Sequence, residues 1–280
     1  MEQVYVNREW VQKSSATIPL NEAGFLRGDG VFETILLENG HFFRLDDHLD
    51  RLFEGLERIR ISTRESRDNL KALLKEYVER NKCTHRIVRL VITRGVYESM
   101  PWEYQGPNSI YITHSDIPAV PESPVRVVFL DECQYPIIRM HPAVKSLNYL
   151  GNILAKLDAY EQGAFEPILY NSHGHITEGG IRNVFFVKNE TLLTPPLHLG
   201  ILSGTMRNAV IDMAEQEGIR CTERLISLKE VDAMDEAFLT STAVKILPVW
   251  WESWSSTYAT TRHLQELFTS FILNENSREE

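Results

Sequence analysis

The sequence contains little cysteine and no long hydrophobic run. Its three cysteines are odd in number and widely spaced, and none belongs to a CxxC pair (Cys83, Cys133, Cys221). This pattern predicts neither a disulfide framework nor a zinc site. No segment approaches the ~18 apolar residues that cross a bilayer, and the N-terminus lacks the charged-then-apolar pattern of a signal peptide. We therefore expect reduced thiols and a cytoplasmic protein without a membrane partner.

Basic charge is also scarce. The chain has 29 Lys and Arg residues against 39 Asp and Glu residues, which gives a formal net charge of −10. Nucleic acids and anionic membrane surfaces require a basic face, so we expect neither as a partner. The sequence shows no internal repeat or low-complexity tract, and 43% hydrophobic with 24% charged residues is typical of a soluble globular protein.

A proline-rich stretch divides the chain into two predicted domains. The segment IPAVPESP contains three prolines, which cannot continue a helix or a central strand. Residues 1–117 form the predicted small N-terminal domain, residues 118–124 the linker, and residues 125–280 the large C-terminal domain. Because strands and helices are mixed without strict alternation, an α+β fold is favoured over a doubly wound sheet.

Hydrophobic periodicity predicts the elements of each domain. In the first, Asn39 and Gly40 between two apolar runs indicate a hairpin, two helices follow in 46–61 and 66–80, and RIVRLVITRG and SIYIT are strands. In the second, VRVVFL and EAFLTST are strands, VFFVKNETLLTP is a hairpin, and a helix from Thr205 to Glu217 ends at Gly218. Another helix, 149–162, carries an apolar stripe (Leu150, Ile153, Leu154, Leu157), and the last lies around 263–273.

A lysine and a remote carboxylate carry the chemical argument. Lys145 lies at a loop-to-helix junction in AVKSLNYLGNILAKLDA, and Glu178 follows in HGHITEGGIRNVFFV. A lysine amine can form a Schiff base with the aldehyde of pyridoxal phosphate, and a carboxylate facing the pyridine nitrogen keeps that nitrogen protonated. A solvated loop lysine and a surface glutamate are the plain alternatives.

The phosphate of such a cofactor needs an anion site, and the chain offers two. Gly204 and Thr205 in GILSGTMRNAV lead into a helix whose free amides favour an anion. Ser203 or Thr205 could instead simply cap that helix. Ser241 and Thr242, at the end of a predicted strand, offer hydroxyls and backbone amides.

Six motifs occur together and in order: GFLRGDGVFET, HLDRL, KSLNYLGNILAK, TEGGIRNVFF, GILSGTMR and FLTSTA. As a set they resemble the fold-type IV pyridoxal phosphate enzymes, the class-IV aminotransferases. That family includes branched-chain aminotransferases, D-amino acid aminotransferases and aminodeoxychorismate lyases. The resemblance runs from about Tyr5 to the last helix. It implies a small N-terminal α/β lobe, a larger β-barrel-like C-terminal lobe with helices, and a homodimer.

The resemblance also implies roles for individual residues. Lys145 matches the Schiff-base lysine, whose freed amine moves the substrate proton, and Glu178 matches the partner of the pyridine nitrogen. Arg51 matches the phosphate-binding arginine. Tyr149 is placed to reach the phenolic oxygen of the cofactor, although it could equally be a packing residue. The other implied cofactor-binding residues are Leu202, Thr205, Met206, Ser241 and Thr242.

Periodicity alone predicts a different place for Arg51. With Leu49 at zero and ~100° per residue, Arg51 lies at roughly 200°, away from the apolar stripe of its helix. The pattern therefore predicts that Arg51 faces solvent, whereas the resemblance turns the same side of the helix toward a phosphate, which suits a guanidinium.

The substrate side is less specific. The D-alanine branch of the family carries an arginine and a histidine shortly after a TRG motif, but here Thr93-Arg94-Gly95 is followed by VYESM, which contains neither. Arg27 and Arg182 are candidates for binding a substrate carboxylate, with a surface or dimer salt bridge as the alternative. Phe32 and Arg94 complete the set of candidate substrate residues.

We therefore expect an aminotransferase that exchanges an amino group between an amino acid, of branched-chain or D-amino acid type, and a 2-oxo acid by a ping-pong mechanism. The alternative is aminodeoxychorismate lyase, which forms 4-aminobenzoate and pyruvate. A third hypothesis is that the protein binds pyridoxal phosphate but is catalytically silent. No metal is predicted, because His173 and His175 lie in a turn sequence and Asp46, Asp47 and Asp50 suit a helix N-terminus.

Overall fold

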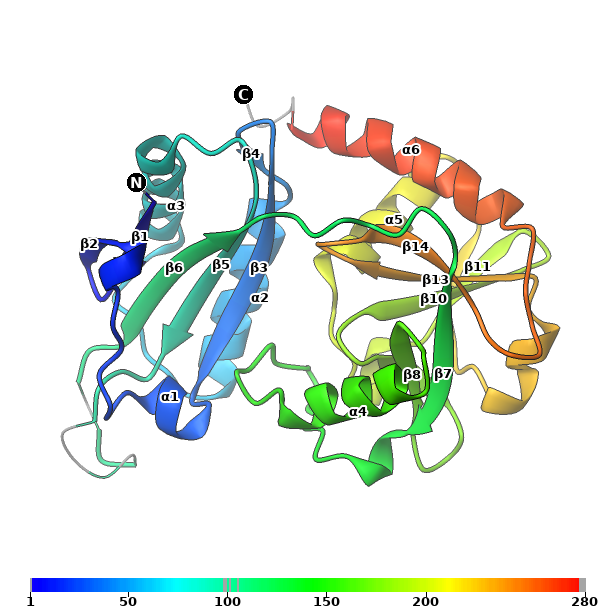
Figure 1. The fold of residues 1–280 in the computed structure, drawn as a ribbon, viewed down its shortest axis with the longest axis horizontal. Helices are drawn as coiled ribbons and strands as arrows, with labels where there is room; N and C mark the ends of the chain where they lie inside the picture. Colours follow the sequence, from blue (N-terminus) through cyan, green and yellow to red (C-terminus); the bar gives the residue numbers. More distant parts are fainter. Residues whose placement is uncertain (1, 98–99, 101, 105, 277–280) are drawn as a thin grey trace. The chain divides into compact units, whose positions relative to one another are not determined.

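Two β-sheets, each with its own helices, organise the chain in the computed structural model (Figure 1). The structure describes residues 2–97, 100, 102–104 and 106–276. The chain divides into two compact units. Unit 1 contains the residues up to Pro118 together with Val144–Asn148, and unit 2 contains Ala119–Ala143 and the residues from Tyr149 onward. The segment around Lys145, which the sequence analysis assigns to the second domain, therefore packs with the first unit.

Unit 1 is built on a six-stranded sheet with the order β2-β1-β6-β5-β3-β4. Its strands pair antiparallel, and β3 and β5 pair along their whole length, from Gly30 opposite Thr93 to Glu38 opposite His85. The elements are β1 (Gln3–Val6), β2 (Glu9–Gln12), η1 (Lys13–Ser15), α1 (Ala23–Arg27), β3 (Gly30–Glu38), β4 (His41–Phe42), α2 (Leu45–Arg58), α3 (Arg67–Asn81), β5 (His85–Thr93) and β6 (Ser109–Ser115).

Local sequence explains these elements. Asn39 and Gly40 have φ angles of 56° and 86°, the left-handed conformation that a tight hairpin between β3 and β4 requires, so the predicted hairpin is confirmed. The side chain of Ser66 accepts a hydrogen bond from the Asn69 amide and thereby caps α3. Helices α2 and α3 pack against one face of the sheet and bury a core that includes Leu49, Leu52, Leu56, Leu70 and Leu74.

Unit 2 is built on a curled eight-stranded sheet with the order β12-β11-β10-β13-β14-β7-β8-β9. The pairs β7–β8, β7–β14 and β11–β12 are parallel, and the other pairs are antiparallel. The elements are β7 (Val125–Asp131), η2 (Glu132–Gln134), α4 (Leu150–Glu161), β8 (Glu166–Tyr170), β9 (Ile176–Gly179), β10 (Asn183–Lys188), β11 (Thr191–Thr194), η3 (Leu197–Leu199), α5 (Thr205–Gln216), β12 (Cys221–Glu223), η4 (Leu228–Ala233), β13 (Glu236–Ser241), β14 (Lys245–Trp250) and α6 (Ala259–Asn276). The predicted α+β fold is confirmed.

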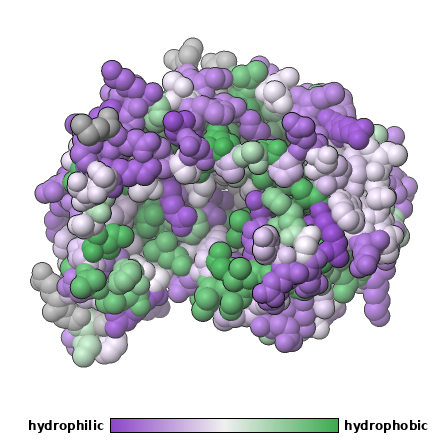
Figure 2. All heavy atoms as spheres, viewed as in Figure 1, coloured by the Kyte–Doolittle hydropathy of each residue, from purple (hydrophilic) through white to green (hydrophobic). Residues whose placement is uncertain are grey.

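Helix α4 forms where it was predicted but presents its apolar stripe differently. The stripe is exposed (Leu150, Ile153, Leu154, Leu157), and hydrophobic atoms lie at the surface in the region of α4 (Figure 2). The buried residues of α4 are Gly151, Ala155 and Ala159. A Cβ on Gly151 would lie 2.6 Å from the backbone of Pro136. The small residues of α4 therefore lie on its buried side, where Gly151 packs against the backbone of Pro136, and the leucines lie on the exposed side of the helix.

Within the described part of the chain, no helix has the length and apolar character needed to cross a membrane. His173 and His175 lie in the turn before β9, where the Asn171 side chain accepts hydrogen bonds from both backbone amides. The same described residues contain no group of three or more His, Cys, Asp or Glu side chains that could hold a metal ion.

Candidate active site

The segment that carries Lys145 is fixed to the start of β3. The Phe32 amide donates to the Lys145 carbonyl oxygen at 3.0 Å, and the Leu147 amide donates to the Gly30 carbonyl oxygen at 3.0 Å. The Asn148 side chain adds a bond to the Gly28 carbonyl oxygen at 2.9 Å. Lys145, Leu147 and Asn148 are thus each bonded to the segment 28–32, so the backbone position of Lys145 is set by the sheet rather than by a free loop.

The Lys145 side chain lies beside an aromatic ring. Its Nζ atom is 4.6 Å from the centroid of the Phe32 ring, and the guanidinium carbon of Arg89 is 4.1 Å from the same centroid. Phe32 is nearly buried, whereas Arg89 is exposed. The structure therefore brings two of the predicted residues, Lys145 and Phe32, together and adds Arg89, which the sequence analysis did not single out.

Arg51 does not face solvent, because it is paired with a buried carboxylate. Its Nε and Nη2 atoms donate to the two carboxylate oxygens of Glu33 at 2.8 and 2.5 Å, and its side chain is only 12% exposed. Glu33 points to the same face of β3 as Val31 and Ile35, which is the face covered by α2. The prediction from helical periodicity was wrong for this reason: the core face of the sheet carries a charge that Arg51 neutralises.

His48 completes this buried group. Its Nδ1 atom lies 2.7 Å from the Glu33 carboxylate. Burial lowers the pKa of His48, more than the neighbouring carboxylate raises it, so the ring is neutral and its Nδ1–H donates to Glu33. Burial alone would raise the pKa of Glu33, but the charge of Arg51 and the bonds from Arg51 and His48 lower it to about 2. Within the described residues the Nε2 atom of His48 has no hydrogen-bond partner.

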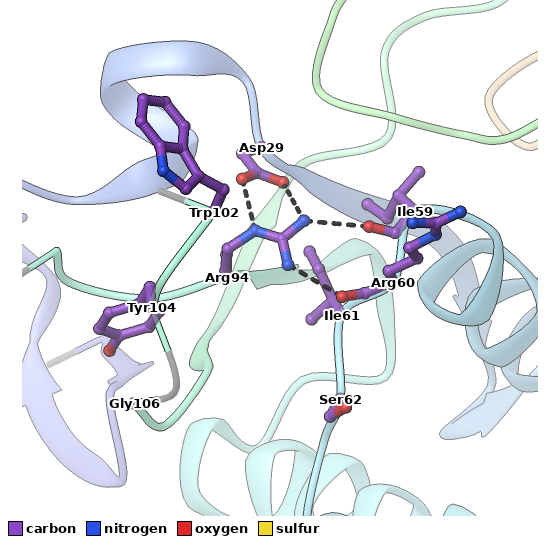
Figure 3. Close-up of a pocket in the computed structure, with 9 residues that line it drawn as sticks. All are labelled: Asp29, Ile59, Arg60, Ile61, Ser62, Arg94, Trp102, Tyr104 and Gly106. Carbon is purple, nitrogen blue, oxygen red and sulfur yellow. Dashed lines mark hydrogen bonds and ion pairs between the residues drawn. The ribbon is translucent and has the colours of Figure 1, made fainter. Parts of the chain in front are cut away.

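Arg94 is engaged inside unit 1. It donates to the two oxygens of Asp29 at 2.6 and 3.1 Å and to the carbonyl oxygens of Ile59 and Arg60 at 3.0 and 2.8 Å (Figure 3). These contacts line a cavity of about 570 Å³ that also contains Trp102 and Tyr104. The guanidinium of Arg94 ties the end of β5 to the end of α2, and its role as a substrate ligand stays a prediction. Residues 98–99, which follow the TRG motif, lie outside the described residues.

Arg27 lines a second, smaller cavity of about 220 Å³ together with Gly28, Ser146 and Asn148. Its guanidinium carbon lies 5.1 Å from the centroid of the Tyr97 ring. Gly28 ends α1 in the left-handed conformation, with φ of 63°, and a Cβ there would meet the Asn148 side chain at 2.6 Å. Arg27 is therefore the candidate substrate arginine that shares a cavity with the neighbours of Lys145.

Glu178 lies near the end of β9 in unit 2 and has partners on both carboxylate oxygens. Oε1 accepts a hydrogen bond from Nη1 of Arg139, while Oε2 accepts bonds from the Leu202 amide at 3.2 Å and from the Asn183 side chain at 3.4 Å. Arg139 also pairs with Glu132 at 2.8 Å. The sequence analysis missed Arg139 and Glu132, because they lie in a loop and a short 3-10 helix without a periodic pattern.

The N-terminus of α5 suits an anion. The residue before the helix is Gly204, which makes no side-chain cap hydrogen bond, and a Cβ there would lie 2.0 Å from Oδ1 of Asn183. The hydroxyl of Ser203 accepts a bond from Asn208 at 3.1 Å. Thr205 and Met206, in the first turn, are buried. A glycine at this position leaves the first amides of the helix open to a phosphate oxygen.

Three further predicted residues have clear places in unit 2. Tyr149 immediately precedes α4, and Ser241 and Thr242 lie at the end of β13. All three are half-buried. They stand at element ends, where a side chain can reach a ligand without disturbing a sheet or a helix.

Arg182 is held by a buried carboxylate. Its Nη1 atom donates to Glu166 at 2.5 Å, and Lys156 donates to the same carboxylate at 2.5 Å. Glu166 is fully buried and also accepts the Ile181 amide at 2.9 Å. Lys156 also donates to the carbonyl oxygen of Phe165 at 2.7 Å, so it serves this internal group rather than solvent. The proposed carboxylate-binding role of Arg182 stays a prediction.

The family model for amino-transferase class IV matches residues 30–250. The chain is 35% identical to a putative branched-chain-amino-acid aminotransferase of Methanocaldococcus jannaschii, over 88% of this chain and 86% of the relative. It is 33% identical to D-alanine aminotransferase of Listeria monocytogenes, again over 88% and 86%. The crystal structure of a branched-chain aminotransferase of Thermoproteus uzoniensis with norvaline matches with a TM-score of 0.89 at 27% identity, over 99% of this chain and 96% of that one.

Each unit taken by itself carries groups whose chemistry fits a phosphorylated pyridine cofactor. Unit 1 has a lysine whose backbone is bonded to β3, and unit 2 has a carboxylate with both oxygens bonded and an α5 N-terminus shaped for an anion. The family match covers more than half of the chain and agrees with the ordered motifs. The protein belongs to the class IV aminotransferases, which are pyridoxal phosphate-dependent enzymes.

Proposed function

We propose that this enzyme transfers an amino group between an amino acid, of branched-chain or D-amino acid type, and a 2-oxo acid by a ping-pong mechanism. The observation that carries the proposal is the fixed position of Lys145, whose amine lies over the Phe32 ring while its backbone is bonded to β3. In each half-reaction the Lys145 amine would have to bond to, and be released from, the aldehyde carbon of the cofactor. A fixed backbone lowers the entropic cost of bringing the amine to that carbon.

We assign the cofactor to nine residues. Lys145 would bond the aldehyde, Arg51 and the α5 amides of Thr205 and Met206 the phosphate, and Glu178 the pyridine nitrogen. When bound, pyridoxal phosphate supplies an aldehyde and an electron-withdrawing ring. The remaining contacts are assigned to Tyr149, Leu202, Ser241 and Thr242. Lys145, once its amine is free, would move the proton at the substrate carbon.

For the substrate carboxylate we propose Arg27 and Arg89. Arg27 shares a cavity with Ser146 and Asn148. Arg89 and Lys145 are two cationic side chains that both lie close to the Phe32 ring. Arg182 is engaged with Glu166. We therefore expect Arg27→Ala and Arg89→Ala to raise the KM for amino acids, whereas Arg64→Ala, an exposed arginine elsewhere in unit 1, leaves the KM unchanged.

We further propose that the protein is a cytoplasmic homodimer and that the apolar stripe of α4 lies in the subunit interface. Leu150 is 66% exposed and Leu157 51% exposed, and Tyr160 beside them is 77% exposed. A contiguous apolar surface on a helix supports association, because its burial removes hydrocarbon from water.

Spectroscopy of the purified yellow protein tests the reaction. Single L- or D-amino acids should convert the visible absorption band to that of the pyridoxamine form. Comparison of the two enantiomers then gives the stereochemical preference of the enzyme. Lys145→Ala should remove the visible band and the conversion, while the exposed Lys75→Ala on α3 should retain both.

Two outcomes would overturn the proposal. If no amino acid converts the band and the protein releases pyruvate from aminodeoxychorismate, the lyase alternative replaces the aminotransferase. If the wild-type protein shows no visible band after reconstitution, the assigned cofactor residues are wrong.

A further inference from the structure

We propose that Glu132 and Arg139 are positioning residues that set the charge and the direction of the Glu178 carboxylate toward the pyridine nitrogen of the cofactor. This inference rests on the proposed role of Glu178. It adds two residues of unit 2 that neither the motifs nor the family resemblance assigned.

Arg139 connects the two carboxylates directly. Its Nη1 atom donates to Oε1 of Glu178, and its Nε and Nη2 atoms donate to Oε2 of Glu132 at 3.1 and 2.8 Å. The three side chains are largely enclosed, with exposures of 19% for Arg139 and 12% for each glutamate. Charge-assisted bonds in such a setting are stronger than at an exposed surface.

A fourth side chain orients Glu132. The Thr177 hydroxyl, one residue before Glu178, donates to Oε2 of Glu132 at 2.9 Å. Thr177 is fully buried. Glu132 is therefore bonded to β9, the strand that also carries Glu178, and the Arg139 guanidinium binds the carboxylates of both glutamates.

The direction of the Glu178 carboxylate is fixed from both sides. Arg139 holds Oε1, while the Leu202 amide and the Asn183 side chain hold Oε2. With both oxygens engaged, rotation about the last side-chain bond would break at least one of these contacts. The lone pairs of the Glu178 carboxylate that are not used in these contacts therefore keep a fixed direction. A hydrogen-bond acceptor for a protonated ring nitrogen requires such a fixed direction.

The charge count explains why a second carboxylate is present. Burial would lower the pKa of Arg139, but Glu178 and Glu132 raise it, so the guanidinium stays charged. Arg139 alone would neutralise Glu178 and leave no net charge for a protonated pyridine nitrogen. With Glu132, the two carboxylates and one guanidinium carry a single net negative charge, which matches the single positive charge of a protonated ring nitrogen.

The experiment follows the protonation of the ring nitrogen itself. The holoenzyme is reconstituted with pyridoxal phosphate carrying ¹⁵N in the ring, and the ¹⁵N chemical shift is recorded against pH. Glu132→Gln removes the second negative charge but keeps a hydrogen-bond acceptor for Arg139. We expect the pH at which the ring nitrogen loses its proton to fall by about one unit or more.

Three further variants separate the possible causes. Glu178→Gln should abolish the protonated signal, and Glu132→Asp, which keeps the charge, should restore most of the wild-type midpoint. Glu236→Gln is the matched control, because Glu236 is a buried carboxylate of unit 2 that caps α6 through Thr260 and Thr261. It should lower thermal stability without moving the midpoint.

The outcomes distinguish this inference from the proposed function. If Glu178→Gln lowers the midpoint and Glu132→Gln leaves it unchanged, the inference is overturned and the role of Glu178 stands. If Glu178→Gln also leaves the ring nitrogen unchanged, the assignment of Glu178 fails, and the inference fails with it. Should Glu132→Gln fold poorly, Arg139→Lys offers a second test: it keeps the charge, so the midpoint should stay close to that of the wild type, and a fall as large as that in Glu178→Gln would overturn the inference.

Discussion

Replacing Glu33 by glutamine should show how strongly the position of Arg51, the proposed phosphate-binding arginine, depends on its buried partner. The pKa of Glu33 falls from an ordinary value of 4.5 to about 2, which corresponds to a stabilisation on the order of 3 kcal/mol near neutral pH. Glu33→Gln removes the charge and leaves the largely buried Arg51 and the fully buried His48 without an ionised acceptor. Breaking one side of a buried pair typically costs about 3–5 kcal/mol.

Thermal unfolding of the cofactor-free protein measures this cost. For a protein of this size 1 kcal/mol shifts Tm by about 2–4 °C, so Glu33→Gln should lower Tm by roughly 6–12 °C. Glu57→Gln, at an exposed position of α2, is the control and should change Tm little.

A double-mutant cycle tests the physical reason. In Arg51→Met the guanidinium is absent, so adding Glu33→Gln should cost far less than it does in the wild type. If the two substitutions add within about 0.5 kcal/mol, the Glu33–Arg51 pair does not carry the stabilisation and the reasoning is refuted.

The same pair predicts a pH dependence with a definite sign. A carboxylate whose pKa is lower in the folded than in the unfolded state stabilises fully above its unfolded pKa and loses that contribution as pH falls. The stability advantage of the wild type over Glu33→Gln should therefore be full above about pH 4.5 and vanish as the pH approaches 2. A constant difference between pH 7 and pH 3 would contradict the assignment.

Three other predictions follow from the packing of unit 2. Glu166→Gln leaves Lys156 and Arg182 without their shared buried carboxylate, so we expect a fall in Tm equivalent to about 3 kcal/mol by calorimetry. Gly204→Ala places a Cβ against Asn183 and should destabilise the protein by about 1–3 kcal/mol in urea titration; no change would mean that Asn183 moves freely. Leu154→Lys with Leu157→Lys should shift the mass measured by analytical ultracentrifugation from dimer to monomer, and an unchanged dimer would remove α4 from the interface.

Local signals in the sequence predicted most elements of both sheets. The Asn39-Gly40 turn, the helix predicted from Ser66 and the helix that begins at Thr205 depend on residues a few positions apart, and all three appear in the structure. The fold class and the family followed from ordered motifs, which record spacing along the chain.

Contacts between segments that are far apart in the sequence could not be predicted from such local signals. The inward turn of Arg51 depends on Glu33, and the alternation of β3 did contain a signal, since Glu33 shares a face with Val31 and Ile35. A charge on the core side of a strand requires an opposite charge nearby. The exposure of the α4 leucines and the role of Arg139 depend on backbone approach and loop geometry, for which the sequence holds no periodic signal.

The chain crosses from one unit to the other three times, because Val144–Asn148 belongs to unit 1 while the residues on both sides of it belong to unit 2. During synthesis, unit 1 cannot be complete when Pro118 leaves the ribosome; it has to wait until Asn148 has emerged. A protein fragment cut at Pro118 would lack the five residues that seal the edge of β3, whereas one cut after Asn148 would retain them. Lys145 thus belongs to the last segment that unit 1 receives, and a chain that has not yet bonded this segment to β3 cannot hold Lys145 in the position described above.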